Sequence, residues 1–96
     1  MARRRYLVTY DISDDKRRTA VFRTLRDHGD HTQFSVFICD LSTAELVALR
    51  GLLSSSLNPR QDQILVLDLG DASDDIGEIV DTLGRAYIPP SRTVVV

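Results

Sequence analysis

The 96-residue sequence contains one cysteine, three prolines, no tryptophan and no long hydrophobic run. The single cysteine, Cys39, excludes an internal disulfide and a cysteine-rich zinc site, and its place in SVFICDL predicts a buried apolar side chain. No apolar run approaches the roughly 20 residues that a membrane span requires, and the basic N-terminus leads directly into a predicted strand. We therefore expect one domain, residues 1–96, that lies in the cytoplasm without a membrane segment.

The charge of the sequence is weak overall but uneven along the chain. The formal net charge is −2, which gives no global signature of nucleic-acid binding. Residues 1–31 nevertheless hold eight Lys/Arg and five Asp/Glu, net +3, whereas residues 32–96 hold four and nine, net −5. The N-terminal third is therefore predicted to present a local basic surface.

Hydrophobic periodicity predicts a strand, a helix and a second strand region in the first half of the chain. The first strand covers residues 5–12. A helix capped by Ser13 begins at Asp14, and Gly29 is expected to end it in the left-handed conformation. The next region, HTQFSVFICDL at 31–41, is rich in β-branched and aromatic residues. Alternation places Phe34, Val36 and Ile38 on one face and Gln33, Ser35, Phe37 and Cys39 on the other.

The second half predicts a helix, a strand, a short helix and a terminal strand. Ser42 and Glu45 form a capping-box pattern, and the helix that follows ends at Asn58-Pro59. Its apolar residues are Leu46, Leu49, Leu53 and Leu57. QILVLDL, residues 63–69, reads as the next strand. Ser73, Asp74 and Asp75 then open a third helix with Ile76, Ile79, Val80 and Leu83 at helical spacing.

The tail, IPPSRTVVV at 88–96, breaks at two prolines and ends as a strand with no hairpin partner of its own. We expect this strand to pair with the sheet of a second subunit. The order of elements is that of an α+β ferredoxin-like sandwich, an antiparallel sheet with two main helices, to which the C-terminal helix and strand are added to complete a homodimer. This fold needs two strands between its helices, and the region before Ser42 has no Asn-Gly or Asp-Gly turn. A bulge or tight bend at residues 33–35 is therefore expected.

Asp11 ends the first predicted strand, within YLVTYDISDDKRR. Aspartate at this place is ordinary turn chemistry, and the acids and bases that follow it can neutralise one another locally. In the functional interpretation, Asp11 is a hard oxygen ligand that suits Mg²⁺, and Arg17 and Arg18 orient a phosphate. One carboxylate per chain is a poor site. A two-fold axis that brought both copies of Asp11 together would permit metal-assisted hydrolysis of a phosphodiester.

Further candidates lie around the second strand region. Phe37 is placed to stack on a base and Ser35 to bond a phosphate or a bound water; the alternative is a core aromatic and a satisfied hydroxyl. His28 and His31 have no third ligand at metal-binding spacing, so we expect exposed loop histidines.

Three features together carry a resemblance to a known family: YDISDDKRR at 10–18, QFSVFICDLS at 33–42 and the spacing between them through Gly29. They resemble the second of the two core CRISPR-associated adaptation proteins, with similarity over about residues 6–69. That family is described as a metal-dependent endoribonuclease or endodeoxyribonuclease and as the partner of the CRISPR integrase. The resemblance implies a ferredoxin-like homodimer with Asp11 as the Mg²⁺ ligand at the dimer cleft. The implied catalytic positions are Asp11, Tyr10, Arg17, Arg18, Ser35 and Phe37.

The resemblance also implies an alternative to catalysis. Members of the family bridge two integrase dimers and hold protospacer DNA by its backbone, a role in which hydrolysis is dispensable. The nucleic-acid-binding positions are then Arg3, Arg4, Arg5, Lys16, Arg17, Arg18 and His31. His31 is included because relatives usually carry an arginine shortly before Q-x-S-V-F, where this chain reads GDHTQ, and a histidine is only partly charged near neutrality.

Three hypotheses therefore stand: a Mg²⁺-dependent nuclease, a non-catalytic adaptor of spacer integration, and a regulatory ligand-binding domain of ferredoxin-like type. The third predicts a Gly-rich ligand loop, which DISDD is not, and the K/R-G-F-G-F-like strand of an RNA-recognition module is absent. The first two differ in whether Asp11 is needed for cleavage. Both leave RNA and double-stranded DNA open as the nucleic acid.

Overall fold

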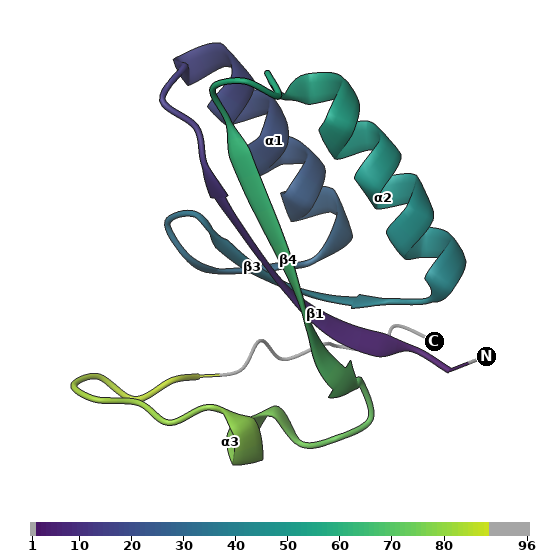
Figure 1. Ribbon diagram of the computed structural model, residues 1–96. Coiled ribbons are helices and arrows are strands. Elements are labelled where there is room, and N and C mark those ends of the chain that lie inside the picture. Colours follow the sequence, from purple (N-terminus) through teal and green to yellow (C-terminus); the bar gives the residue numbers. More distant parts are fainter. Residues whose placement is uncertain (1, 89–96) are drawn as a thin grey trace.

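The computed structural model describes residues 2–88, which form one antiparallel sheet with two long helices on one of its faces (Figure 1). The strand order is β2-β3-β1-β4. This is the predicted ferredoxin-like α+β arrangement. The elements are β1 (Arg4–Asp11), α1 (Asp15–His28), β2 (Asp30–Gln33), β3 (Val36–Leu41), α2 (Thr43–Ser56), β4 (Gln63–Asp71) and α3 (Ile76–Ile79).

Both long helices begin at side-chain caps. The Ser42 and Glu45 capping box of α2 is confirmed, because the Glu45 N–H donates to Ser42 Oγ at 3.2 Å and the Ser42 N–H donates to Glu45 Oε1 at 2.9 Å. The cap of α1 was predicted at Ser13 but lies one residue later. The carboxylate of Asp14 accepts from the Arg17 N–H at 2.9 Å, and a carboxylate at this end also faces the positive pole of the helix.

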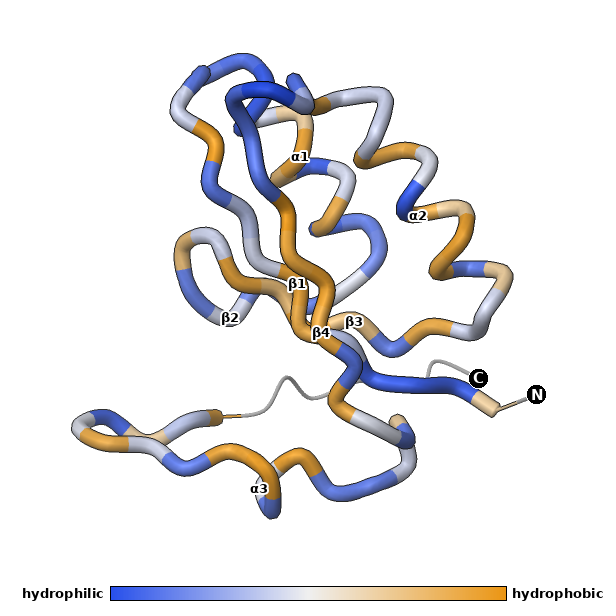
Figure 2. The backbone as a smooth tube through the Cα atoms, in the orientation of Figure 1, coloured by the Kyte–Doolittle hydropathy of each residue, from blue (hydrophilic) through white to orange (hydrophobic). Residues whose placement is uncertain are grey.

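The core lies between the sheet and the two long helices. Alternate residues of β1 face it, so Tyr6, Val8 and Tyr10 are buried while the residues between them are partly exposed. The other buried apolar residues are Ile12, Val21, Leu25, Phe37, Cys39, Leu41, Leu49 and Leu53. Figure 2 shows β4 as hydrophobic along its middle and hydrophilic at its ends. The predicted burial of Cys39 is confirmed.

The region between the helices is a tight hairpin, which confirms the predicted reversal. β2 and β3 are joined by the two-residue turn Phe34-Ser35, and the ladder contains a bulge between His31 and Gln33. Ser35 therefore lies in the turn and not in a strand as the simple alternation suggested. Phe37 faces the helices and is fully buried.

Gly29 is required for close approach and not for a left-handed cap. Its φ of −167° is extended, so the predicted left-handed conformation is wrong. A Cβ built at Gly29 would lie 2.4 Å from Cys39 Sγ and 2.7 Å from the Ile38 carbonyl oxygen. The end of α1 can therefore reach the sheet only if this position has no side chain.

The opposite face of the sheet, which we call the open face, is not covered by α1 or α2. The pairing register puts Leu7 beside both Ile38 and Leu67, and Thr9 beside both Val36 and Leu65. Leu65 and Leu67 are each 46% exposed. The open face thus consists of Leu7, Thr9, Val36, Ile38, Leu65 and Leu67.

The C-terminal part is less regular than expected. The third helix is a single turn capped by Asp75, and Leu83, which was predicted to be in it, lies outside and is 96% exposed. The predicted subunit-pairing strand lies, apart from Ile88, outside the described residues. Within residues 2–88, neither long helix combines the length and apolarity needed to cross a bilayer.

We predict that Gly29→Ala lowers the free energy of unfolding by about 2 kcal/mol, because the new methyl group overlaps Cys39 and the β3 backbone. Gly51→Ala is the matched control. Nothing lies within 4 Å of a Cβ at that position of α2, so alanine is expected to stabilise the helix by about 0.5 to 1 kcal/mol. Urea unfolding of both variants measures the difference. Equal effects of the two substitutions would contradict the close-approach explanation.

Candidate nucleic-acid and metal site

Asp11 is the last residue of β1 and is exposed, next to the buried Ile12. Its backbone position is fixed because β1 pairs with β4 at Asp11 and Gln63. Within the described part of the chain, the Asp11 carboxylate has no hydrogen-bond or ion-pair partner. This acid is thus held in place by the sheet while its oxygens stay available for an external ligand.

Tyr10 and Ser35 are brought together beside Asp11. The Tyr10 N–H donates to the Ser35 carbonyl at 3.1 Å, and the Tyr10 hydroxyl donates to the Phe34 carbonyl at 3.4 Å. Burial raises the pKa of Tyr10, although the nearby charge of Arg18 acts in the opposite direction. Tyr10 therefore stays a neutral phenol near neutrality and fixes the β2–β3 turn against the end of β1.

Arg18 lies over the loop that follows Asp11. Its Nη1 donates to the carbonyls of Ile12 at 3.2 Å and Ser13 at 3.1 Å, and its Nη2 forms an ion pair with the exposed Asp15. Two carbonyls and one surface carboxylate hold this guanidinium without burying it, since its side chain is 45% exposed. The structure thus brings Arg18 to the predicted site.

Arg17 points elsewhere, although it is the neighbouring residue. Its Nε donates to Asp62 Oδ2 at 2.7 Å and its Nη2 to Asp62 Oδ1 at 3.2 Å, and Gln61 accepts a further bond at 3.1 Å. The Asp62 side chain is 0% exposed. This bidentate pair ties α1 to the loop before β4, so a phosphate would have to compete with Asp62 for Arg17.

The three N-terminal arginines are also occupied by the chain itself. Arg3 pairs with Asp40 at 2.8 Å and Glu45 at 2.7 Å, and Arg4 pairs with Asp68 at 2.9 Å. These hydrogen bonds raise the pKa of both arginines. Arg5 donates to the carbonyls of residues 72 and 74 at 3.0 and 2.8 Å. The predicted basic surface is therefore largely neutralised at the start of β1.

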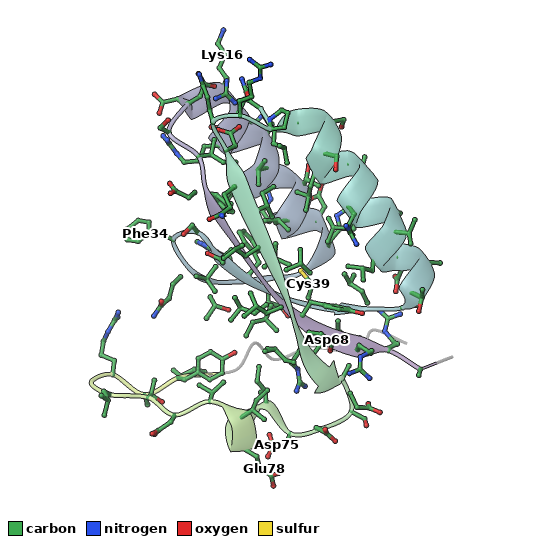
Figure 3. The ribbon with its side chains drawn as sticks, in the orientation of Figure 1. Lys16, Phe34, Cys39, Asp68, Asp75 and Glu78 are labelled. Carbon is green, nitrogen blue, oxygen red and sulfur yellow. The ribbon has the colours of Figure 1, made fainter. Side chains whose placement is uncertain are left out.

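Lys16, unlike these arginines, is not held by other groups of the described residues. It is exposed and has no hydrogen-bond or ion-pair partner among residues 2–88. Figure 3 shows it extending from the N-terminal end of α1. Of the seven predicted nucleic-acid-binding residues, Lys16 and Arg18 are the most available to a phosphate.

The two histidines lie in a helix and a strand and not in loops as predicted, although the predicted exposure of His31 is confirmed. His28 closes α1, with its Nδ1 2.7 Å from the Thr24 carbonyl, and His31 lies in β2. The His31 ring stacks on Phe37 with centroids 4.8 Å apart, and its Nε2 donates to the Phe34 carbonyl at 2.9 Å. His31 thus supports the turn beside Ser35.

Phe37 cannot stack on a base, and the alternative interpretation of it as a core aromatic is confirmed. It is 0% exposed and packs against Tyr10, Phe22 and His31 with ring centroids 6.5, 5.5 and 4.8 Å apart. Its place in the site is structural, because it holds Tyr10 and His31 in position. The exposed aromatic residue of the QFSVF segment, residues 33–37, is Phe34.

Sequence reasoning missed two features of the site. The first is the buried Asp62, which no pattern in NPRQDQ distinguishes from an ordinary turn acid. The second is a pocket of about 300 Å³ between α1 and the β2–β3 turn. Thr19 and Phe22 line it together with Tyr10, Arg18, His31, Phe34 and Ser35. Phe22 of α1 lies opposite His31 of β2, with 5.1 Å between ring centroids, and the sequence pattern did not bring these two residues together.

The donors of one chain fit a magnesium ion only in part. Mg²⁺ binds through one or two carboxylates and keeps several waters, so the free Asp11 carboxylate suits it. Among residues 2–88 there is no group of three His, Cys, Asp or Glu side chains able to enclose a metal. A second carboxylate from another molecule would complete this donor set.

Comparison with known proteins gives consistent matches. The family model described as CRISPR associated protein Cas2 matches residues 4–75. The chain is 40% identical over 82 residues to CRISPR-associated endoribonuclease Cas2 1 of Rhodospirillum rubrum, covering 85% of this chain and 79% of that protein. It is 33% identical over 94 residues to CRISPR-associated endonuclease Cas2 2 of Thermus thermophilus, covering 98% and 97%. The crystal structure of Streptococcus pyogenes Cas2 superimposes with a TM-score of 0.73 at 32% identity, covering 83% of this chain and 99% of that one.

We predict that Arg17→Ala destabilises the fold most at neutral pH. Hydrogen bonds from Arg17, and then from the Asn58 N–H, hold the pKa of Asp62 below its ordinary value. Such a group stabilises the folded state above its unfolded pKa of about 3.9, and this contribution is lost as the pH falls through the lower folded pKa. The difference in unfolding free energy between wild type and variant should therefore shrink below about pH 4.

Urea unfolding at several pH values measures this difference. Arg23→Ala is the matched control, because Arg23 lies exposed on the same helix without an ion-pair partner among the described residues. A loss in Arg17→Ala that is the same at acidic and neutral pH would rule out the Asp62 pair as its cause.

Proposed function

The chain belongs to the CRISPR associated protein Cas2 family, and from this premise we propose that it is a Mg²⁺-dependent endonuclease of CRISPR spacer acquisition. It would hydrolyse phosphodiester bonds in RNA or DNA. The observation that carries the proposal is the exposed, unpartnered Asp11 carboxylate at the end of β1, in a chain whose neighbouring charges are mostly paired. The endoribonuclease and endonuclease names of the relatives support the reaction class.

The residues around Asp11 have separate roles in this proposal. Asp11 would hold Mg²⁺, and the bound ion supplies Lewis acidity toward a phosphate oxygen and a more acidic water. Arg18, fixed over the carbonyls of Ile12 and Ser13, would neutralise the phosphate. Tyr10 and Ser35 keep the turn and the end of β1 in register through the bond between their backbones. Lys16 would add long-range attraction for the nucleic acid.

A homodimer is part of the proposal because one Asp11 is not enough. The open face supports it, since its apolar side chains at 7, 36, 38, 65 and 67 extend over β1 and both strands that flank it. Leu65 and Leu67 of this apolar face are half exposed, and packing two such sheets face to face would remove them from water. A two-fold axis through this face would also allow the two β1 strand ends to approach each other.

A second candidate function is the non-catalytic adaptor, which bridges CRISPR integrase dimers and holds protospacer DNA by its backbone. The exposed side chains of Lys16 and Arg18 support it, because phosphate binding needs cations but no metal. Lys16 and Arg18 serve both functions. The two functions differ in what the Asp11 carboxylate contributes.

We expect Asp11→Asn to reduce Mg²⁺-dependent cleavage at least about 100-fold, because the substitution removes the carboxylate that would hold the ion and losing even an outer-shell partner of a metal costs 10- to 100-fold. The measurement compares cleavage of single-stranded RNA and double-stranded DNA in Mg²⁺ and in EDTA. Asp81→Asn is the control, since Asp81 is exposed and lies far along the chain. Cleavage that is absent from the wild type, or equal in wild type and Asp11→Asn, would overturn the nuclease and leave the adaptor.

We expect Leu67→Glu to shift the protein from dimer to monomer. A charge on the open face, beside Leu7, would have to be buried without a partner if the two sheets packed together. Light scattering at matched concentrations gives the mass. Val47→Glu is the control, because Val47 is 66% exposed on α2, away from the open face. A wild type that is monomeric, or a Leu67→Glu variant that stays dimeric, would contradict this interface.

A further inference from the structure

Phe34 occupies the tip of the β2–β3 turn and is 95% exposed. Figure 3 shows its ring pointing away from the body of the molecule. It contributes nothing to the core, and the ring contacts of the described residues do not include it. A single exposed apolar side chain is common on protein surfaces, so the case for an external partner depends on what surrounds Phe34.

The backbone that carries Phe34 is held from two sides. Its carbonyl accepts bonds from His31 Nε2 at 2.9 Å and from the Tyr10 hydroxyl at 3.4 Å, and the carbonyl of Ser35 accepts from the Tyr10 N–H at 3.1 Å. His31 and Tyr10 are in turn packed against the buried Phe37. The exposed ring therefore stands on a fixed support, so a partner that stacks on it would order little additional chain.

Beside this ring is the pocket of about 300 Å³ between the turn and α1. This volume is at the lower end of the range for small-ligand sites, about 300 to 1,000 Å³. Its lining combines the aromatic residues Tyr10, Phe22 and His31 with the hydroxyl-bearing residues Thr19 and Ser35. A flat, partly polar group such as a nucleobase matches this combination of ring faces and hydrogen-bonding groups.

Positive charge lies along the same side of α1. Arg18 lines the pocket, and Arg26, eight residues further, places its guanidinium carbon 5.9 Å from the Phe22 ring centroid. Residues at this spacing share one face of a helix. Asp15, which pairs with Arg18, is the acidic group that acts against this charge, and its side chain is 88% exposed.

We propose that Phe34 and the adjoining pocket receive an unpaired nucleobase of a single-stranded nucleic acid, while Arg18 and Arg26 bind the flanking phosphates. The inference rests on the proposed function in one respect, that the protein binds nucleic acid, and it holds for nuclease and adaptor alike. It assigns a place on this chain to one base, beside Arg18. Bases within a duplex already stack on each other, so this site selects unpaired segments or ends over continuous duplex.

The test uses oligonucleotides that carry 2-aminopurine, as single-stranded RNA, single-stranded DNA and a DNA duplex, titrated with the full chain. Stacking on Phe34 should quench the fluorescence of the single strands. We expect Phe34→Ala to abolish the quenching and to weaken single-strand binding roughly 5- to 100-fold, as for the loss of one stacked base. Duplex binding and the salt dependence should stay unchanged, because the ring releases no counterions.

Three variants complete the design. Phe34→Tyr should retain binding and quenching because it keeps the ring. Arg18→Gln should lower the salt slope by about one, as expected for one lost phosphate contact. Val47→Ala, which removes an exposed apolar side chain from α2, should change nothing.

The outcomes separate this inference from the function on which it rests. If the wild type binds neither single strands nor duplex at low salt, both fall. If the wild type binds but Phe34→Ala binds and quenches equally well, only the stacking site is overturned. If Phe34→Ala instead lowers the mass seen by light scattering, the ring belongs to a contact between copies of the chain and the proposal is likewise overturned. A difference between RNA and DNA strands with intact Phe34 dependence identifies the sugar that the site accepts.

Discussion

The rest of the structure depends on the pairing of β1 with strands on both of its edges. β1 pairs with β3 from Arg4 to Thr9 and with β4 from Arg4 to Asp11, and these two ladders fix its register. The burial of Tyr6, Val8 and Tyr10 fixes which face of β1 is turned to the helices. A slip by one residue would turn these three side chains to the open face. The position of Asp11 is a consequence of the same register. The residue with the free carboxylate is therefore anchored by the best-secured strand of the domain.

Charge in this small domain is used mainly to hold elements together. Arg3 and Arg4 connect the start of β1 to β3, α2 and β4, and Arg17 connects α1 to the loop before β4. Each exposed ion pair of this kind contributes little to the stability of the fold, whereas the bidentate pair with the buried Asp62 contributes more. The uneven charge along the sequence thus reflects pairing between the two parts of the chain. The cations that remain for a nucleic acid include Lys16, Arg18 and Arg26, near the N-terminal end and on the outer side of α1.

The fold could be predicted from the sequence because its signals are local. The Ser42 and Glu45 box, the Asn58-Pro59 stop and the alternation around Cys39 each specify a boundary or a face by short-range chemistry. The role of Gly29, and the choice between the two interpretations of Phe37, could not be predicted in the same way. Gly29 is required because the sulfur atom of Cys39, ten residues later in the sequence, lies against it in the fold. Phe37 is buried because Phe22 and His31 pack over its ring. Arg17 and Arg18 are adjacent in sequence. Only the position of Asp62 in the fold makes Arg17 a structural residue and leaves Arg18 available for binding.

The open face and the outer edge of β4 together have a consequence for the newly made protein. No strand of the described residues pairs with that edge, and the leucines beside it are half exposed. An unprotected edge next to apolar side chains is the usual starting point of intermolecular β-association. A chain that is released faster than it finds its correct partner is therefore exposed to aggregation, so yield on overexpression should depend on the rate of synthesis as much as on the stability of the folded domain.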